Sequence, residues 1–258
     1  MLRYFSRFAL FWTALLITAL PVKAAPDSSG PCPTGRAASL VLPRVRNALN
    51  SNAELTIVAF GSSSTQGWHS TSIAQSYPAV LQAELSAALP NAHVAVINRG
   101  IGGQDATEML PRIAADVLSV RPSLVIWQVG ANGVIKNRDP DQFHSLVAAG
   151  VQTLQAAGID VVLMDNQRAP AILNAPHHIE IDQATADVAM RTGAGLFDRG
   201  ALMDQWRLGG HTYEEFLSGD GIHHNDLGYR CVARALASAI LDGLSQPLTL
   251  AHAALAHR

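Results

Sequence analysis

The feature that most constrains the fold of this chain is a series of short, continuously apolar runs separated by longer amphipathic stretches. Five runs have the length of strands: residues 55–60, 94–98, 124–129, 161–164 and, more weakly, 195–198. Runs that are apolar throughout, rather than at alternate positions, are typical of strands covered on both faces of a parallel sheet. We therefore expect a parallel sheet at the centre of the molecule.

The stretches between these runs carry helix-start signals. These signals are Pro78, the capping-box pair Asp105 and Glu108, and the dipeptide Asp139-Pro140. Two more helices are expected at about residues 40–49 and 226–244. Because strands and helices alternate along the chain, the pattern predicts one three-layer α/β/α domain with a parallel sheet of about five strands.

The loops after the expected strands hold the least ordinary sequences in the chain. They read Gly-Ser-Ser-Ser-Thr at 61–65, Asn-Arg-Gly-Ile-Gly-Gly at 98–103, Gly-Ala-Asn-Gly at 130–133 and Asp-Asn-Gln at 165–167. Asp-Gly-Ile-His-His-Asn at 220–225 precedes the last helix. Ligands of an open parallel sheet bind beyond the carboxyl ends of its strands, so we expect these loops to share one functional edge.

The residue types at this edge suit acyl transfer. A serine such as Ser63 becomes a nucleophile when an imidazole takes its proton, and His223 lies three residues from Asp220, a carboxylate that can orient the ring. The developing oxyanion needs fixed donors, for which the backbone N–H of Gly100 and the side-chain amide of Asn132 are suitable types.

Each of these signals also has an ordinary structural interpretation. Ser63 could cap a helix, His223 could lie on the surface, and Asn132 between glycines could occupy a turn. The glycines of 98–103 could suggest a dinucleotide loop, but they lack the full GxGxxG spacing. The coincidence of four such loops in order favours the catalytic interpretation.

These residues resemble the SGNH hydrolase superfamily, also called GDSL-type lipases and esterases. The family's Gly-Asp-Ser-x-Ser/Thr block is similar to 61–65 and implies Ser63 as nucleophile. Its Asn-x-Gly-x-x-Gly and Gly-x-Asn-Asp blocks imply Gly100 and Asn132 as oxyanion-hole donors, with the N–H of Ser63. Its Asp-x-x-His block implies Asp220 and His223 as the rest of a catalytic triad.

The resemblance covers about residues 55–244 and departs from the family pattern at two positions. Ser62 replaces the aspartate before the nucleophile, and Gly133 replaces the aspartate after Asn132. Neither is a triad or oxyanion position. The resemblance implies a flavodoxin-like α/β/α fold without a cofactor, and the spacing of histidines, cysteines and acids indicates no metal site.

Three neighbours of the blocks are candidate substrate-binding residues. Trp68, together with His69, could line a pocket for the acyl or alcohol group, or pack at a helix start. Asp165 and Gln167 could bind substrate or support the nucleophile loop. His224 is the less favoured base, because the Asp-x-x-His spacing selects its neighbour His223.

The start of the chain has the form of a secretory signal peptide. Arg3 and Arg7 precede a short apolar stretch that ends in small residues near Ala24, so we expect cleavage there and a periplasmic or secreted protein. The expected organisation is a signal peptide at 1–24, a mature N-terminal segment at 25–54 whose first part, 25–36, is loose, the hydrolase domain at 55–244 and a tail at 245–258.

Charge and cysteine content limit the partners. Removing residues 1–24 deletes three basic residues and no acid, so the formal net charge changes from −2 to −5. An acidic protein of this kind is a poor binder of nucleic acid or anionic lipid, and no stable membrane insertion is expected after cleavage. Cys32 and Cys231 could form a disulfide in an oxidising compartment or remain two separate thiols.

The sequence therefore predicts an exported serine hydrolase that cleaves carboxylic esters through an acyl-enzyme. Short-chain or O-acetyl esters of sugars or envelope polymers are the favoured substrates. The alternatives are a lysophospholipase, a thioesterase or an O-acyltransferase that uses the same residues. A non-catalytic carbohydrate-binding relative is disfavoured because Ser63, Asp220 and His223 are all present.

Overall fold

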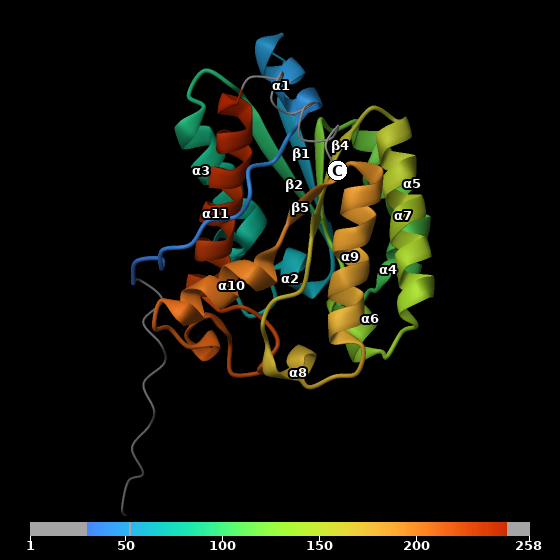
Figure 1. Cartoon of the computed structure of the whole chain (residues 1–258). Coiled ribbons are helices and arrows are strands. Elements are labelled where there is room, and N and C mark those ends of the chain that lie inside the picture. The colour runs from blue at the N-terminus through green and yellow to red at the C-terminus, as the bar shows by residue number, and fades with distance from the viewer. Residues whose placement is uncertain (1–29, 52, 247–258) are drawn as a thin grey trace, which may run out of the picture.

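The computed structural model describes residues 30–51 and 53–246, and its centre is one parallel sheet (Figure 1). The strands are β1 (Leu55–Gly61), β2 (Val94–Gly100), β3 (Leu124–Gln128), β4 (Asp160–Met164) and β5 (Gly195–Phe197). They lie in the order β2-β1-β3-β4-β5, and all pairs are parallel. This is the strand order of flavodoxin-like folds, so the predicted fold class is confirmed.

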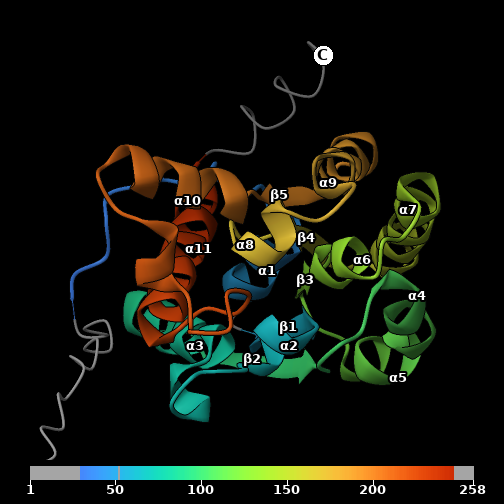
Figure 2. The same cartoon turned by 90° about the horizontal axis from the view of Figure 1, so that it is seen from below.

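Helices cover both faces of the sheet. The long ones are α3 (Tyr77–Ala88), α7 (Pro140–Ala156), α9 (His178–Thr192), α10 (Arg199–Leu208) and α11 (Asp226–Ser245). Figure 1 and Figure 2 show α3 and α11 on one face and α7 and α9 on the other. The core between these layers is fully apolar in places, as at Ile57, Val125 and Val162, each of which has no exposed surface.

Short helices connect these layers. They are α1 (Pro43–Asn50), α2 (Ser63–Gln66), α4 (Ala106–Met109), α5 (Ile113–Asp116), α6 (Ala131–Ile135) and α8 (Pro170–Leu173). Single turns of 3₁₀ helix lie at Ile73–Gln75, Leu110–Arg112, Leu118–Val120 and Tyr213–Phe216. None of the described helices is long and apolar enough to cross a membrane.

The helix-start signals work as their chemistry suggests. Asp139 accepts a hydrogen bond from the backbone N–H of Gln142 at the start of α7. Asp105 and Glu108 form the expected capping box, although the helix they begin, α4, is only four residues long. Asn225 caps α11 by accepting from the N–H of Gly228. Each side chain satisfies a backbone donor that has no partner within its own helix.

The N-terminal segment belongs to the core, which corrects the expectation that the folded part begins near residue 55. Leu40, Leu42 and Val45 are each at most 3% exposed, and the N–H of Leu40 donates to the carbonyl of Ala239 in α11. A disulfide joins Cys32 to Cys231 of α11. The predicted signal peptide, 1–24, and most of the predicted tail, 245–258, lie outside the described residues.

The topology places the predicted functional loops at one edge of the sheet. The chain leaves β1 in one direction to reach β2 and returns past β1 to β3, so β1 and β3 flank the switch point of the strand order. Because the loops that leave two such strands run in opposite directions, a crevice stays open between them. This crevice is the usual ligand site of an open parallel sheet. Figure 2 looks onto this edge, where α2 follows β1 and α6 follows β3.

Candidate active site

Ser63 is the first residue of α2, directly beyond the carboxyl end of β1. The turn before it is held by Gln128 at the end of β3, whose Oε1 accepts from the N–H and hydroxyl of Ser62 at 3.0 and 2.9 Å. Ser63 is 8% exposed, so its hydroxyl is almost enclosed but can still be reached. Sequence analysis did not single out Gln128, because a polar residue that ends an apolar strand has no local signal.

Ser63, His223 and Asp220 form a continuous hydrogen-bonded chain. The Oγ of Ser63 lies 2.7 Å from Nε2 of His223, and Nδ1 of His223 lies 2.5 Å from Oδ2 of Asp220. An ionised carboxylate can only accept, so Nδ1 carries the ring proton, and in the neutral ring Nε2 is left free to accept from Ser63. The structure thus brings together the three residues that the sequence named as a triad.

Asp220 is held in its ionised form. Its partial burial alone would raise the pKa of the carboxyl. Hydrogen bonds from His223, Ser218 and the N–H of Ile222 outweigh burial and hold the pKa of Asp220 well below its usual range. The carboxylate is therefore charged at neutral pH, and it orients the imidazole.

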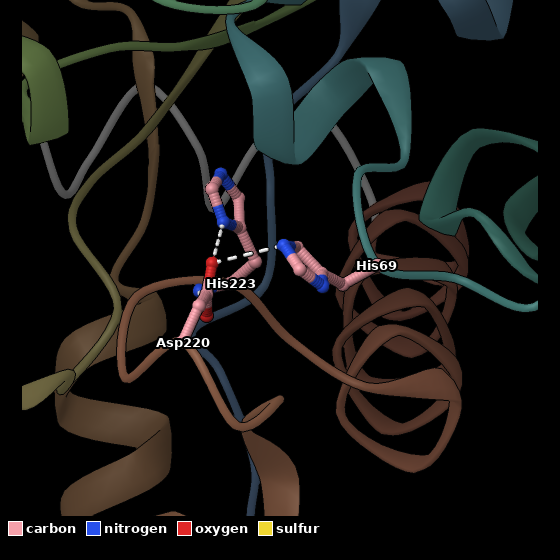
Figure 3. A group of neighbouring side chains, drawn as sticks. All are labelled: His69, Asp220 and His223. Carbon is pink, nitrogen blue, oxygen red and sulfur yellow. Dashed lines mark hydrogen bonds and ion pairs between the residues drawn. The ribbon is translucent and has the colours of Figure 1, made fainter.

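A second imidazole lies against this pair (Figure 3). Nε2 of His69 is 3.1 Å from Oδ2 of Asp220, the same oxygen that His223 contacts, and the two rings stack with centroids 5.3 Å apart. The Trp68 ring is 5.7 Å from the ring of His223, and its Nε1 donates to Oε1 of Gln66. Trp68 is about half exposed, so its position suits the predicted contact with substrate.

The structure changes the expectation for Gly100. Its N–H donates to Oδ1 of Asn98 at 2.9 Å and is therefore already engaged. A glycine is needed there for space, because a Cβ on Gly100 would meet the backbone N of Gln66 at 2.1 Å. Asn132 lies in α6 and uses one of its amide protons to donate to the carbonyl of Gln104 at 2.9 Å. Its second amide proton leaves Asn132 able to serve as an oxyanion donor.

Asp165 and Gln167 do not line the site, which corrects their prediction as substrate-binding residues. They are 5% and 1% exposed. Asp165 accepts from the N–H groups of Arg199 and Gly200, while Nε2 of Gln167 donates to the carbonyl of Ile222 beside His223. Their role is support: Asp165 holds the start of α10, and Gln167 holds the loop that carries His223.

Arg199 joins Asp165 to Gln167, a role that the sequence analysis did not predict. Its guanidinium, with no exposed surface, donates to the carbonyl of Asp165 and to Oε1 of Gln167. Burial lowers the pKa of Arg199. An arginine directly after a predicted strand would ordinarily be assigned to the surface, and only its tertiary partners show otherwise.

Comparison with known proteins identifies the family of this chain. The model of the non-GDSL lipase-like family matches residues 31–246. The chain belongs to this family. Its motif blocks and fold place it in the SGNH hydrolase superfamily, as the sequence blocks indicated. The departure at Ser62, which removes the aspartate of the GDSL block, agrees with the family's description as non-GDSL.

Solved structures share the fold of this non-GDSL lipase-like protein. A two-domain esterase active on acetylated mannans is 21% identical with a TM-score of 0.71, over 83% of this chain and 57% of that chain. The acetylxylan esterase Axe2 from Geobacillus stearothermophilus is 18% identical with a TM-score of 0.62, over 74% and 94%. The lipase/acylhydrolase from Enterococcus faecalis is 22% identical with a TM-score of 0.62, over 70% and 93%. The chain thus spans little more than half of the two-domain esterase. No curated protein sequence matches it.

His224 has a structural position in this family member. The ring has no exposed surface, and its Nδ1 pairs with the carbonyl of Phe216 at 3.0 Å. Burial, with the nearby charge of Arg199, lowers the pKa of His224 to about 3. A ring that is neutral and enclosed in this way is not placed to accept a proton from Ser63.

Proposed function

We propose that this protein is a carboxylic ester hydrolase that works through an acyl-enzyme on Ser63. The observation that carries the proposal is the unbroken chain from Ser63 Oγ through His223 to Asp220, at 2.7 and 2.5 Å. Its members come from the two ends of the domain, since Ser63 and His223 are 160 residues apart. Membership of a lipase-like family supports the same reaction class.

The geometry supports two half-reactions. Ser63 Oγ attacks the ester carbonyl carbon while Nε2 of His223 takes the hydroxyl proton, and Asp220 stabilises the imidazolium that forms. The tetrahedral intermediate then expels the alcohol, which receives that proton from His223. Water attacks the acyl-enzyme, with His223 again as base, and releases the acid and the free serine.

The oxyanion donors we propose are the Ser63 N–H, the Asn132 amide and the Gly103 N–H, which replaces Gly100. Gly103 has φ +78°, and no atom lies within 4 Å of where its Cβ would be. Within the described part of the chain, no acceptor contacts its N–H. Its neighbours reach both sides of the site, because Gly102 donates to Gln66 of α2 and Gln104 accepts from Asn132. Donors fixed before the reaction are worth a few kcal/mol each in the transition state.

For substrate we propose short acyl esters, in particular O-acetyl groups on sugars outside the cytoplasm. Trp68 offers a half-exposed aromatic face beside His223, fixed by its hydrogen bond to Gln66, on which a sugar ring can stack. Two fold relatives carry names that describe esterases of acetylated mannan and acetylxylan. Export is supported by the signal-like start of the sequence and by the Cys32–Cys231 disulfide.

The test of the mechanism compares two adjacent serines. Ser63→Ala should abolish hydrolysis of p-nitrophenyl acetate and labelling by a fluorophosphonate, because the nucleophile is gone. Ser64→Ala, its matched control, removes the neighbouring hydroxyl and leaves the Ser63–His223 contact in place. It should keep both activities. Both variants should melt within a few degrees of the wild type. An active, folded Ser63→Ala protein would contradict the proposal.

Substrate choice is tested separately with p-nitrophenyl esters of increasing chain length and with acetylated xylan and mannan. We expect acetyl to butyryl esters to be cleaved fastest, and acetate to be released from the polysaccharides. Faster cleavage of esters of twelve or more carbons would exclude the short-chain assignment while leaving the mechanism intact.

A further inference from the structure

We propose that His69, Asp220 and His223 form a zinc-binding site, and that zinc bound there inhibits the hydrolase. The three side chains present one ligand atom each within 4.8 Å of one another. Zinc binding itself is independent of the proposed function, whereas the inhibition rests on it.

The donor set is suited to zinc. Two imidazoles and one carboxylate offer nitrogen and oxygen atoms of the kind that zinc takes in three-ligand sites, whose fourth position is open to water. Magnesium and calcium prefer all-oxygen sites, so they should bind here weakly. The side chains of His69 and Asp220 are 45% and 25% exposed, which gives an ion a path from solvent.

The ligand atoms already converge on one point. Nε2 of His69 and Nδ1 of His223 lie 3.1 and 2.5 Å from the same oxygen, Oδ2 of Asp220 (Figure 3). Two atoms that ligate one tetrahedral zinc at about 2.0–2.1 Å lie roughly 3.3 Å apart. Each nitrogen therefore needs a distance from Oδ2 that is less than about 1 Å longer than the one observed, and all three ligand atoms already lie within 4.8 Å of one another.

The backbone holds His69 in this position. Its φ of 63° is in the left-handed region, which is uncommon for a residue other than glycine. The carbonyl of the preceding Trp68 accepts a hydrogen bond from the hydroxyl of the buried Tyr229 at 2.7 Å. The imidazole is thus turned toward Asp220 by a constrained loop, so a ligand would find it already oriented.

Zinc at this point would reverse the tautomer that catalysis needs. Coordination uses the lone pair of Nδ1 of His223, so the ring proton moves from Nδ1 to Nε2. An Nε2 that carries a proton cannot accept one from Ser63 Oγ. The ion also occupies Oδ2 of Asp220, which then no longer orients the ring. Both changes remove the base without any movement of the nucleophile.

The first measurement is calorimetric titration of the purified protein, without a histidine tag, with zinc chloride at neutral pH. We expect one zinc ion per chain. His69→Asn should weaken binding by about tenfold or more, since even the loss of a group that only supports a ligand costs about 10- to 100-fold. Asparagine tolerates the left-handed backbone at this position, so the loop should keep its shape.

The matched control is His144→Asn. Nε2 of His144 also contacts a carboxylate, Oδ2 of Asp187, at 2.8 Å, but on α7 and α9 and away from the hydrolase residues. This variant removes an imidazole of similar exposure and should leave the zinc affinity unchanged. Magnesium chloride at the same concentration serves as the control for charge alone.

The second measurement is ester hydrolysis with and without zinc, expressed for each variant as a ratio to its own zinc-free rate. We expect zinc to inhibit the wild type and His144→Asn at the concentration that saturates binding, and EDTA to reverse the inhibition. For His69→Asn, the zinc concentration that gives half-maximal inhibition should be at least tenfold higher. No zinc binding by calorimetry, or binding unaffected by His69→Asn, would overturn the proposal. Zinc binding that depends on His69 in a protein without esterase activity would retain the site and refute the proposed function.

Discussion

At the residue scale, the triad was the easiest part of the site to predict. Asp220 and His223 are three residues apart, a spacing that lets one turn bring the carboxylate to the ring. In the structure Oδ2 of Asp220 lies 2.5 Å from Nδ1 of His223. Whether a polar residue beside a strand end lines the site or supports it depends on tertiary burial. Asp165 was misassigned because its partners, the N–H groups at the start of α10, are 34 and 35 residues away.

His69 was grouped with Trp68 as a pocket residue, and its contact with the catalytic carboxylate was not foreseen. His69 and Asp220 are about 150 positions apart in the sequence, so no spacing rule for metal ligands applies to them. Only the packing of the loop after α2 against the loop before α11 brings the rings of His69 and His223 together. A contact of this kind between two distant loops leaves no local pattern in the sequence.

The buried ring of His224 makes stability depend on pH. Burial lowers its pKa to about 3 in the fold, against 6.5 as its ordinary value. As the pH falls below about 6.5, the His224 ring binds a proton in the unfolded chain but stays neutral in the folded chain. The free energy of unfolding should therefore fall by up to about 1.4 kcal/mol per pH unit from this group.

Urea unfolding between pH 7 and 5 measures this effect. His224→Gln can still donate to the carbonyl of Phe216 and does not titrate, so its stability should change less over this range, even if it is less stable throughout. A variant with the same pH slope as the wild type would show that His224 is protonated in the fold. The same substitution is a poor test of catalysis, because it disturbs a residue with no exposed surface.

At the scale of elements, the strands were well predicted and two of the long helices were not. Each predicted strand lies within one or two residues of an observed one, because continuous apolar runs leave little choice for a strand buried on both faces. Sequence analysis named no start signal for α9, which begins after His177 with φ 60° and without a side-chain cap. Helix α10 follows β5 without a loop, and Asp198 caps it directly.

Asp160 joins two elements through a carboxylate that should also respond to pH. It begins β4, and its Oδ2 accepts from the N–H groups of Arg44 and Val45 at the start of α1 at 2.8 and 3.0 Å. Burial raises the pKa of Asp160 from 3.8 to about 6 despite these bonds. Its contribution to stability is complete below about pH 4 and is lost as the pH rises through 6.

Asp160→Asn keeps an oxygen that can accept both bonds and removes the charge. The free energy of unfolding of the variant, relative to that of the wild type, should rise by about 1 to 2 kcal/mol as the pH increases from 4 to 7. This figure allows for solvent screening of the carboxyl. Chemical denaturation of the two proteins at several pH values checks this. A difference that is constant with pH would mean that the carboxyl of Asp160 keeps its ordinary pKa.

At the scale of the whole molecule, the disulfide closes almost the entire described chain. Cys32 and Cys231 are 199 residues apart, and the chain-entropy model assigns a loop of this length about 5 kcal/mol of stabilisation. Sequence analysis left this pairing open, because two cysteines in a chain allow it without requiring it. Residues 25–36 were expected to be loose, since they are rich in proline, serine and glycine, yet the bridge ties Cys32 to α11.

Reduction should therefore lower the melting temperature measurably without removing the hydrolase site, because neither cysteine contacts Ser63, Asp220 or His223. The measurement is a thermal melt with and without dithiothreitol, with Cys32→Ser/Cys231→Ser as the matched reduced state. Titration of the denatured, unreduced protein should find no free thiol. Two titratable thiols would exclude the bridge.

The position of the proposed catalytic groups along the chain also predicts when the protein becomes active during its synthesis. Ser63 leaves the ribosome early, whereas Asp220 and His223 belong to the last fifth of the chain, just ahead of the helix that carries Cys231. A nascent or truncated chain that ends between residues 197 and 220 contains the nucleophile and all five described strands but neither Asp220 nor His223. On the proposed mechanism, the serine therefore stays unreactive until residues 220–223 have been made and α11 has docked.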